Sequence, residues 1–160
     1  MKKTNILYTI LASMLVLGMG SCKKDPVVGG TAVQALAGEW WVTTVGSDGS
    51  TSKVYALSTY NLASNRPDSL WIDDGNKYYG LKAKVGCSVP GLSFSVASAN
   101  ELYFGVKVTV TLGKIMPMAA TAPGSKDKTD SIYFKAVFTG DPVTYTYSGY
   151  KRTGFAQDDH

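Results

Sequence analysis

Apolar and polar residues alternate along most of the chain after Gly38. The clearest stretch is Tyr103–Ile115, where valines at every second position oppose lysine and threonine. A period of two is that of a β-strand with one buried face. The first strand opens with two adjacent tryptophans, Trp40 and Trp41, and continues through β-branched residues. The pattern predicts eight strands: Glu39–Val45, Lys53–Asn61, Ser69–Asp73, Tyr78–Cys87, Leu92–Ala97, Tyr103–Ile115, Ser131–Thr139 and Val143–Lys151.

Eight strands joined by short links, with almost no helix, predict an all-β fold. Eight is the number at which an antiparallel sheet closes around a side-chain core or one small ligand. We therefore expect an eight-stranded up-and-down barrel over residues 31–156, with a two-sheet β-sandwich as the alternative. Thr31 fits the capping position of a helix and is followed by good helix formers up to Ala37 before Gly38, so Thr31–Ala37 predicts a short helix at one end of the barrel. Residues 157–160 are polar and terminal, and we expect a disordered tail there.

The N-terminal segment has the features of a secretory signal. Lys2 and Lys3 precede an apolar run from Ile6 to Leu17, which is too short to span a membrane comfortably. The run Leu17-Gly18-Met19-Gly20-Ser21-Cys22 resembles a bacterial lipobox, which implies removal of residues 1–21 and lipidation of Cys22. Residues 22–30 then form a tether, and several acyl chains on Cys22 hold the protein to a membrane. We expect a cell-envelope location, in the outer membrane, with the membrane face left open.

Charge and chemistry narrow the function further. The net charge of +4 falls to about +2 once Lys2 and Lys3 are removed, which does not indicate nucleic-acid binding. The only histidine, His160, is the last residue, and Cys87 is the only cysteine left for the domain, so we expect no catalytic residues and no enzyme. The acidic run Asp73-Asp74-Gly75-Asn76 is typical of a tight turn, with calcium binding as the alternative. We expect no metal and no cofactor.

Five segments carry a resemblance to a known family. They are Gly38-Glu39-Trp40-Trp41-Val42, Ser58-Thr59-Tyr60-Asn61, Asp68-Ser69-Leu70-Trp71-Ile72-Asp73-Asp74, Asp130-Ser131-Ile132-Tyr133-Phe134 and Ser148-Gly149-Tyr150-Lys151-Arg152-Thr153-Gly154-Phe155. The chain resembles bacterial lipoproteins termed lipid-binding putative hydrolases, and its Gly-x-Trp start resembles the lipocalin (calycin) pattern. That resemblance implies a structural latch at the closed barrel end, in which Arg152 packs over Trp40. Lys151 competes with Arg152 for this position, and ligand entry is expected at the opposite end.

Aromatic residues supply the candidate ligand site. Tyrosine-rich pockets can hold an acyl chain while offering hydroxyls to a polar head. The candidates are Trp71, Tyr79, Phe94, Phe134 and Tyr145. The alternative is that these rings only fill the barrel. We expect a lipid-anchored, non-catalytic binding protein for a small hydrophobic or amphiphilic, lipid-like molecule. The competing hypothesis is a structural or accessory envelope lipoprotein that binds a protein or glycan partner through loops such as Ala120–Asp130.

Overall fold

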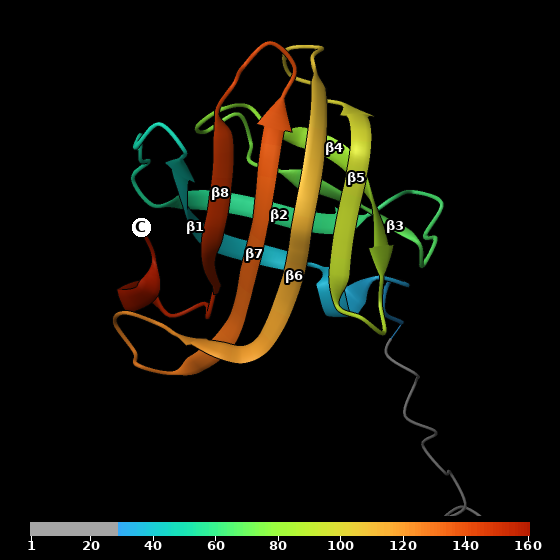
Figure 1. Cartoon of the computed structure of the whole chain (residues 1–160). Helices are drawn as coiled ribbons and strands as arrows, with labels where there is room; N and C mark the ends of the chain where they lie inside the picture. Colours follow the sequence, from blue (N-terminus) through green and yellow to red (C-terminus); the bar gives the residue numbers. More distant parts are fainter. Residues whose placement is uncertain (1–28) are drawn as a thin grey trace, which may run out of the picture.

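Eight consecutive strands close into a barrel in the computed structural model, which describes residues 29–160 (Figure 1). Each strand pairs antiparallel with the next, and β1 pairs with β8. The predicted up-and-down barrel is confirmed, and this closure excludes the β-sandwich. The strands are β1 (Gly38–Gly46), β2 (Tyr55–Asn61), β3 (Ser69–Asp73), β4 (Lys82–Ser88), β5 (Ser93–Asn100), β6 (Lys107–Thr121), β7 (Lys128–Phe138) and β8 (Thr144–Lys151).

Several predicted boundaries are wrong, among them the start of β6, which is Lys107 and not Tyr103, and the end of β5, which is Asn100 and not Ala97. Strand β4 begins at Lys82 and not at Tyr78, because the preceding residues form a hairpin loop in which the Asp74 carboxylate accepts hydrogen bonds from the backbone of Asn76 and Gly80 (2.8 and 3.0 Å). The expected loop at Ala120–Asp130 is shorter than predicted, because β6 extends to Thr121 and β7 begins at Lys128. In the hairpin between β3 and β4, the carboxylates of Asp73 and Asp74 accept hydrogen bonds from the backbone of Gly75 and Asn76, so they stabilise this hairpin turn.

The N-terminal helix is a single 3₁₀ turn, η1 (Gln34–Leu36). No side chain caps it, so Thr31 does not play the expected capping role. Val33 and Leu36 are fully buried against the barrel core, which closes the end of the barrel nearest Trp40. Within residues 29–160, no helix is long and apolar enough to cross a membrane. The expected signal peptide (residues 1–21), Cys22 and most of the tether lie outside the described residues.

Large side chains from every strand fill the interior. Trp40, Phe134, Phe138 and Tyr147 are among the largest that are fully buried. Phe134 stacks on Tyr147 with 4.4 Å between ring centroids, and Phe94 meets Phe134 edge to face at 5.7 Å. Aromatic pairs at these separations contribute beyond the area they bury. The inner faces predicted from the alternation therefore form one continuous core.

The barrel wall is irregular between β4 and β5. The two strands pair only over Gly86–Ser88 and Ser93–Ser95. Further along, the chain after β5 returns to β4, where the Leu102 N–H donates to the Lys82 carbonyl at 2.9 Å. Strand β5 also shifts its register twice against β6, between Phe94 and Ala99. The first shift places an extra residue in β6 and the second an extra residue in β5. The β4–β5 ladder ends at Gly86 and Ser95, so the wall opens between residues 83–85 and 96–100.

Candidate functional site

A groove lies over this opening, and we call it the β4–β5 groove. Its volume is about 630 Å³, which falls within the usual range for small-molecule sites. The groove is open to solvent. It lies on the side of the barrel formed by β3, β4 and β5, whose arrangement Figure 1 shows. Its lining residues come from the β2–β3 loop, these three strands and the turn after β5: Arg66, Asp68, Ser69, Trp71, Lys84, Val85, Gly86, Val96, Ser98, Ala99, Asn100 and Leu102.

The apolar part of the groove comes from three elements. Trp71 lies half-buried on the outer face of β3, because its neighbours Leu70 and Ile72 point into the core. Val96 lies between the two register shifts of β5 and also packs against the core. Leu102 follows β5 and is 52% exposed. An indole and two aliphatic side chains along one groove can cover an acyl chain or another apolar body.

The polar part of the groove is cationic. The Arg66 guanidinium pairs with the Asp68 carboxylate through Nε and Nη2, and these hydrogen bonds lower the pKa of Asp68 to about 2. Lys84 is the cross-strand neighbour of Trp71 and is exposed. Among the described residues, Lys84 forms no ion pair. The groove thus combines an apolar wall with one balanced ion pair and with Lys84, which has no ion-pair partner in the part of the chain that the structure describes.

An outer-face network borders the groove and centres on Asp73. Its carboxylate accepts from the Lys82 ammonium (2.8 Å), the Tyr60 hydroxyl (2.9 Å) and the Tyr103 hydroxyl (2.6 Å). Burial raises the pKa of Asp73, but these donors together with the Gly75 N–H outweigh it and bring the pKa to about 2. A carboxylate with so low a pKa is a weak general base near neutral pH. The contacts of Asp73 join β2, β3, β4 and the turn after β5, so the role of this network is structural.

The five predicted ligand-binding residues do not come together. Phe94 and Phe134 are buried in the core, and Tyr145 is 7% exposed at its edge. Tyr79 stacks on Phe138 at 4.2 Å, and both Tyr79 and Tyr145 donate to the Asp141 carboxylate. These two tyrosines close the barrel at its Asp141 end. Of the five, only Trp71 lines the β4–β5 groove.

Sequence reasoning missed the other groove residues. The sequence places Arg66 and Asp68 in the loop before Ser69 and Lys84 on the polar face of a strand, and neither position by itself indicates a ligand site. The available signal was the break in alternation at Ala97–Asn100, where four small or polar residues follow Val96. Such a break marks a bulge, and bulges are common next to functional sites.

The predicted latch has different partners. The Lys151 ammonium lies over the Trp40 ring, 5.8 Å from its centroid, whereas the Arg152 guanidinium lies over Trp41 at 5.0 Å. The register explains the correction, because Trp40 pairs directly with Lys151 and the two share the inner face. Arg152, one residue further on, points outward with Trp41. The predicted Arg152–Trp40 latch is therefore wrong, although Trp40 and Trp41 each have a cationic side chain over the ring.

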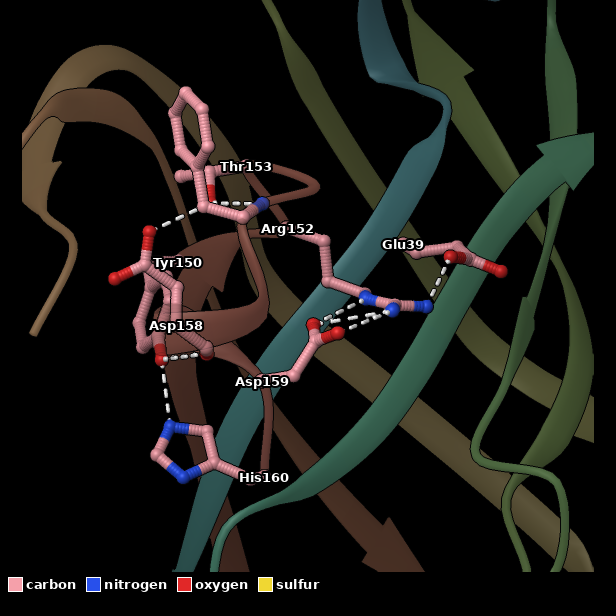
Figure 2. Close-up of polar contacts among 8 residues, drawn as sticks. Glu39, Tyr150, Arg152, Thr153, Asp158, Asp159 and His160 are labelled. Atoms are coloured by element: carbon pink, nitrogen blue, oxygen red, sulfur yellow. Dashed lines mark hydrogen bonds and ion pairs between the residues drawn. The ribbon is translucent and has the colours of Figure 1, made fainter. Parts of the chain in front are cut away.

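Residues 157–160 are not a disordered tail but fold back over the outside of β1. Arg152 binds Glu39 on one side and Asp159 on the other, and the His160 ring lies 2.7 Å from the Tyr150 hydroxyl (Figure 2). The His160 ring also meets Trp41 edge-on at 5.5 Å. This cover leaves Trp41 only 8% exposed although it faces outward.

Asp158 anchors this C-terminal segment. Its buried carboxylate accepts from the backbone N–H groups of Gly124 and Ser125 (both 2.8 Å) and from the hydroxyls of Ser125 and Thr153 (2.7 and 2.6 Å). Burial raises the pKa of Asp158, but these hydrogen bonds outweigh it and bring the pKa to about 2. The chain end is thereby joined to the β6–β7 turn.

The closed up-and-down barrel, with an inward tryptophan near one sealed end, has the architecture of a lipocalin-like protein. The family profile described as "lipid-binding putative hydrolase" matches residues 25–156, and the chain belongs to this family. The match covers the whole barrel, and both the family and the fold fit a lipid-binding role. None of the curated proteins matches the chain.

Proposed function

We propose that this protein is a lipid-anchored, non-catalytic binding protein of the bacterial cell envelope, and that it holds one small amphiphilic, lipid-like molecule in the β4–β5 groove. The observation that carries this proposal is the groove itself, in which Trp71, Val96 and Leu102 lie beside Lys84 and Arg66. An apolar wall next to a cation suits a molecule with an apolar tail and a polar head.

The groove suits a ligand better than the barrel interior does. Trp40 and the η1 turn occupy one end, the stacked Phe134 and Tyr147 rings fill the middle, and Tyr79 closes the other end over Phe138. A ligand would have to displace these contacts to enter, whereas the groove is already open.

The non-catalytic part of the proposal rests on the state of the reactive groups. Burial raises the pKa of the Cys87 thiol, which keeps it protonated, whereas a nucleophilic cysteine needs a lowered pKa. His160 packs on Trp41 and Tyr150, and Asp73 is held by several donors. These contacts are those of structural groups.

The lipid anchor is proposed from the lipobox-like run at Cys22, and the outer membrane is its proposed location. Gly29, the first described residue, follows Cys22 by seven positions, a stretch that spans at most roughly 25 Å when extended. The barrel would therefore lie close to the membrane that holds the acyl chains. Labelling with a radioactive or alkyne fatty acid should mark the wild-type chain and not Cys22→Ser.

Ligand binding is tested on the mature chain carrying Cys22→Ser. Native mass spectrometry and calorimetry across fatty acids, lysophospholipids and phospholipids should find at least one ligand bound with one-to-one stoichiometry. Trp71→Ala should weaken that binding about tenfold, because the indole supplies the largest apolar contact in the groove. Tyr133→Ala, on the outer face of β7, is the matched control and should bind normally. Absence of binding across the whole panel would refute the proposal.

A second function is favoured by one exposed turn. Leu102, Tyr103 and Phe104 follow β5 and are 52%, 36% and 63% exposed. Consecutive exposed apolar residues are typical of a surface that binds another protein. If the accessory function is correct, Phe104→Ser should abolish crosslinking to a specific envelope protein and leave amphiphile binding unchanged.

A further inference from the structure

The charges around the β4–β5 groove point to the head group of its ligand. Resting on the function proposed above, we propose that the groove selects amphiphiles with an anionic head group, a carboxylate or a phosphate, and that Lys84 and Arg66 bind that head group. The only carboxylate among the lining residues is Asp68, and Arg66 already neutralises it. Lys84 therefore leaves the lining with a net positive charge.

Lys84 is set apart from the neighbouring lysine on the same face of β4. Lys82 is neutralised by Asp73 at 2.8 Å, and Tyr60 and Tyr103 bind the same carboxylate. Lys84 has Trp71 and Val85 as groove neighbours and no carboxylate partner among the described residues. An ammonium beside an indole, with no counter-ion, is suited to receive an anion from solution.

The backbone of Lys84 adds a donor at the same place. Alternate residues of β4 direct their N–H and C=O groups toward β5, as the bond from the Leu102 N–H to the Lys82 carbonyl shows. Lys84 follows by two positions, so its N–H also faces β5. The β4–β5 pairing covers only Gly86–Ser88, so Lys84 lies beyond the end of this ladder. We infer that its N–H is a further donor on the β5 side of the groove.

Arg66 and Asn100 supply further donors from opposite sides of the groove. Arg66 uses Nε and Nη2 for Asp68, which leaves the Nη1 amino group outside that pair. The Asn100 side-chain oxygen accepts a hydrogen bond from Lys107, so its NH₂ group remains as a donor. Carboxylates and phosphates accept several hydrogen bonds at once, and each of these groups donates.

The groove also disfavours other head groups. A quaternary ammonium or amine would meet the unneutralised Lys84 charge, and like charges at short range repel. A neutral glycerol or sugar head can use the donors but gains no charge–charge attraction. The order of affinity should therefore be anionic, then neutral, then cationic for amphiphiles with the same tail.

The test uses the mature chain with Cys22→Ser and a series of dodecyl amphiphiles, each kept below its micelle concentration. Calorimetry compares dodecanoate, dodecyl phosphate, monododecanoyl glycerol and dodecyl trimethylammonium. We expect at least one anionic member to bind about tenfold more tightly than the neutral one. Dodecanoate and dodecyl phosphate are measured separately. Tighter binding of dodecanoate would identify the ligand as a free fatty acid, and tighter binding of dodecyl phosphate would identify it as a phosphate-bearing lipid.

Variants test whether Lys84 supplies the positive charge that binds the head group. Lys84→Gln should lower the affinity for the anionic ligand about five- to tenfold and leave the neutral ligand unchanged, whereas Lys84→Arg should restore most of the anionic affinity. Lys135→Gln removes the same charge from β7, away from the groove lining, and should have no effect. Raising the ionic strength from about 0.01 to 0.15 M should weaken only the anionic ligands, since the Debye length falls from about 30 to about 8 Å.

Two results would overturn this inference. Equal affinity for anionic and neutral members, with Trp71→Ala weakening both, would remove the head-group selectivity and leave the proposed function intact. Absence of binding by every member would remove both. Circular dichroism of each variant shows whether a loss reflects the groove or the fold.

Discussion

Trp40 provides a sharp test of how the sealed barrel end is held. Its side chain is fully buried, its Nε1–H donates to the Thr59 hydroxyl at 2.9 Å, and that hydroxyl donates to the Leu36 carbonyl at 2.7 Å. One hydrogen-bond chain thus joins β1, β2 and the η1 turn. The Lys151 ammonium lies over the ring at 5.8 Å. Trp40→Ala removes the ring, the cation–π contact and one end of the chain together.

The expected cost is large. Removing a buried tryptophan side chain costs about 3–5 kcal/mol of unfolding free energy, through lost burial and the cavity left behind. For a domain of this size that corresponds to a fall of roughly 10–20 °C in melting temperature. Trp40→Phe keeps most of the ring volume and loses the indole donor, so it should cost about 1–2 kcal/mol. Fatty-acid labelling of Cys22 should be unchanged in both variants.

Urea denaturation followed by far-ultraviolet circular dichroism measures these losses without relying on the tryptophan signal. The matched control is Lys151→Met, which keeps the aliphatic stem over Trp40 and removes the cation, and should cost about 0.5–1 kcal/mol. A Trp40→Ala variant within about 1 kcal/mol of wild type would refute the sealed-end reasoning. A loss for Trp40→Phe equal to that for Trp40→Ala would show that the hydrogen bond, and not the packing, dominates.

Three further predictions concern the outer surface. The pKa of Asp158 is about 2 in the folded state, below the unfolded value of about 3.9. The ionised carboxylate therefore stabilises the fold above pH ~4, and this stabilisation is lost as the pH falls toward 2. In an acid titration of the unfolding free energy, Asp158→Asn should lack this loss between pH ~4 and 2. Arg152→Gln should lower the melting temperature by only a few degrees, because its ion pairs are exposed, but it should raise acrylamide quenching of Trp41. Cys87 should react slowly with a thiol reagent at pH 8, because burial raises its pKa, and rapid labelling would contradict its half-buried position.

The groove shows how a local irregularity makes a site on a regular barrel. Seven of the eight strand interfaces pair over four or more residues, whereas β4 and β5 pair over three. Glu101 follows the part of β5 that is not paired with β4, and its buried carboxylate accepts from the N–H groups of Lys82, Tyr103 and Phe104. The opening is thus closed at both ends by hydrogen bonds, and Glu101→Gln should widen it.

Much of the architecture could be predicted from the sequence because period-two alternation is local information. Val106, Val108 and Val110 indicate a buried face without reference to any other strand, and eight such stretches with short links favour closure. The burial of Trp40 follows from the same alternation. The short turn before Gly38 was also predictable, although it is one 3₁₀ turn and its cap differs.

Features that depend on strand register or on contacts between residues far apart in the chain are seen only in the tertiary structure. Whether Lys151 or Arg152 covers Trp40 depends on a one-residue offset between β1 and β8, and a shift of one position moves a side chain to the other face. The polar chain end suggests disorder when it is taken alone, but it is held by Asp158 because donors over 30 positions away, at Gly124 and Ser125, lie within hydrogen-bond distance.

The same division applies to the groove. Strand alternation places Lys84 on an outward face, since it is flanked by apolar residues, and it identifies Trp71 only as one of several aromatic candidates. The folded barrel shows that the two are cross-strand neighbours and that they line one groove with Val96 and Leu102. The reason is physical: alternation is set by the backbone of one strand, whereas a groove is set by how several strands are offset and spaced.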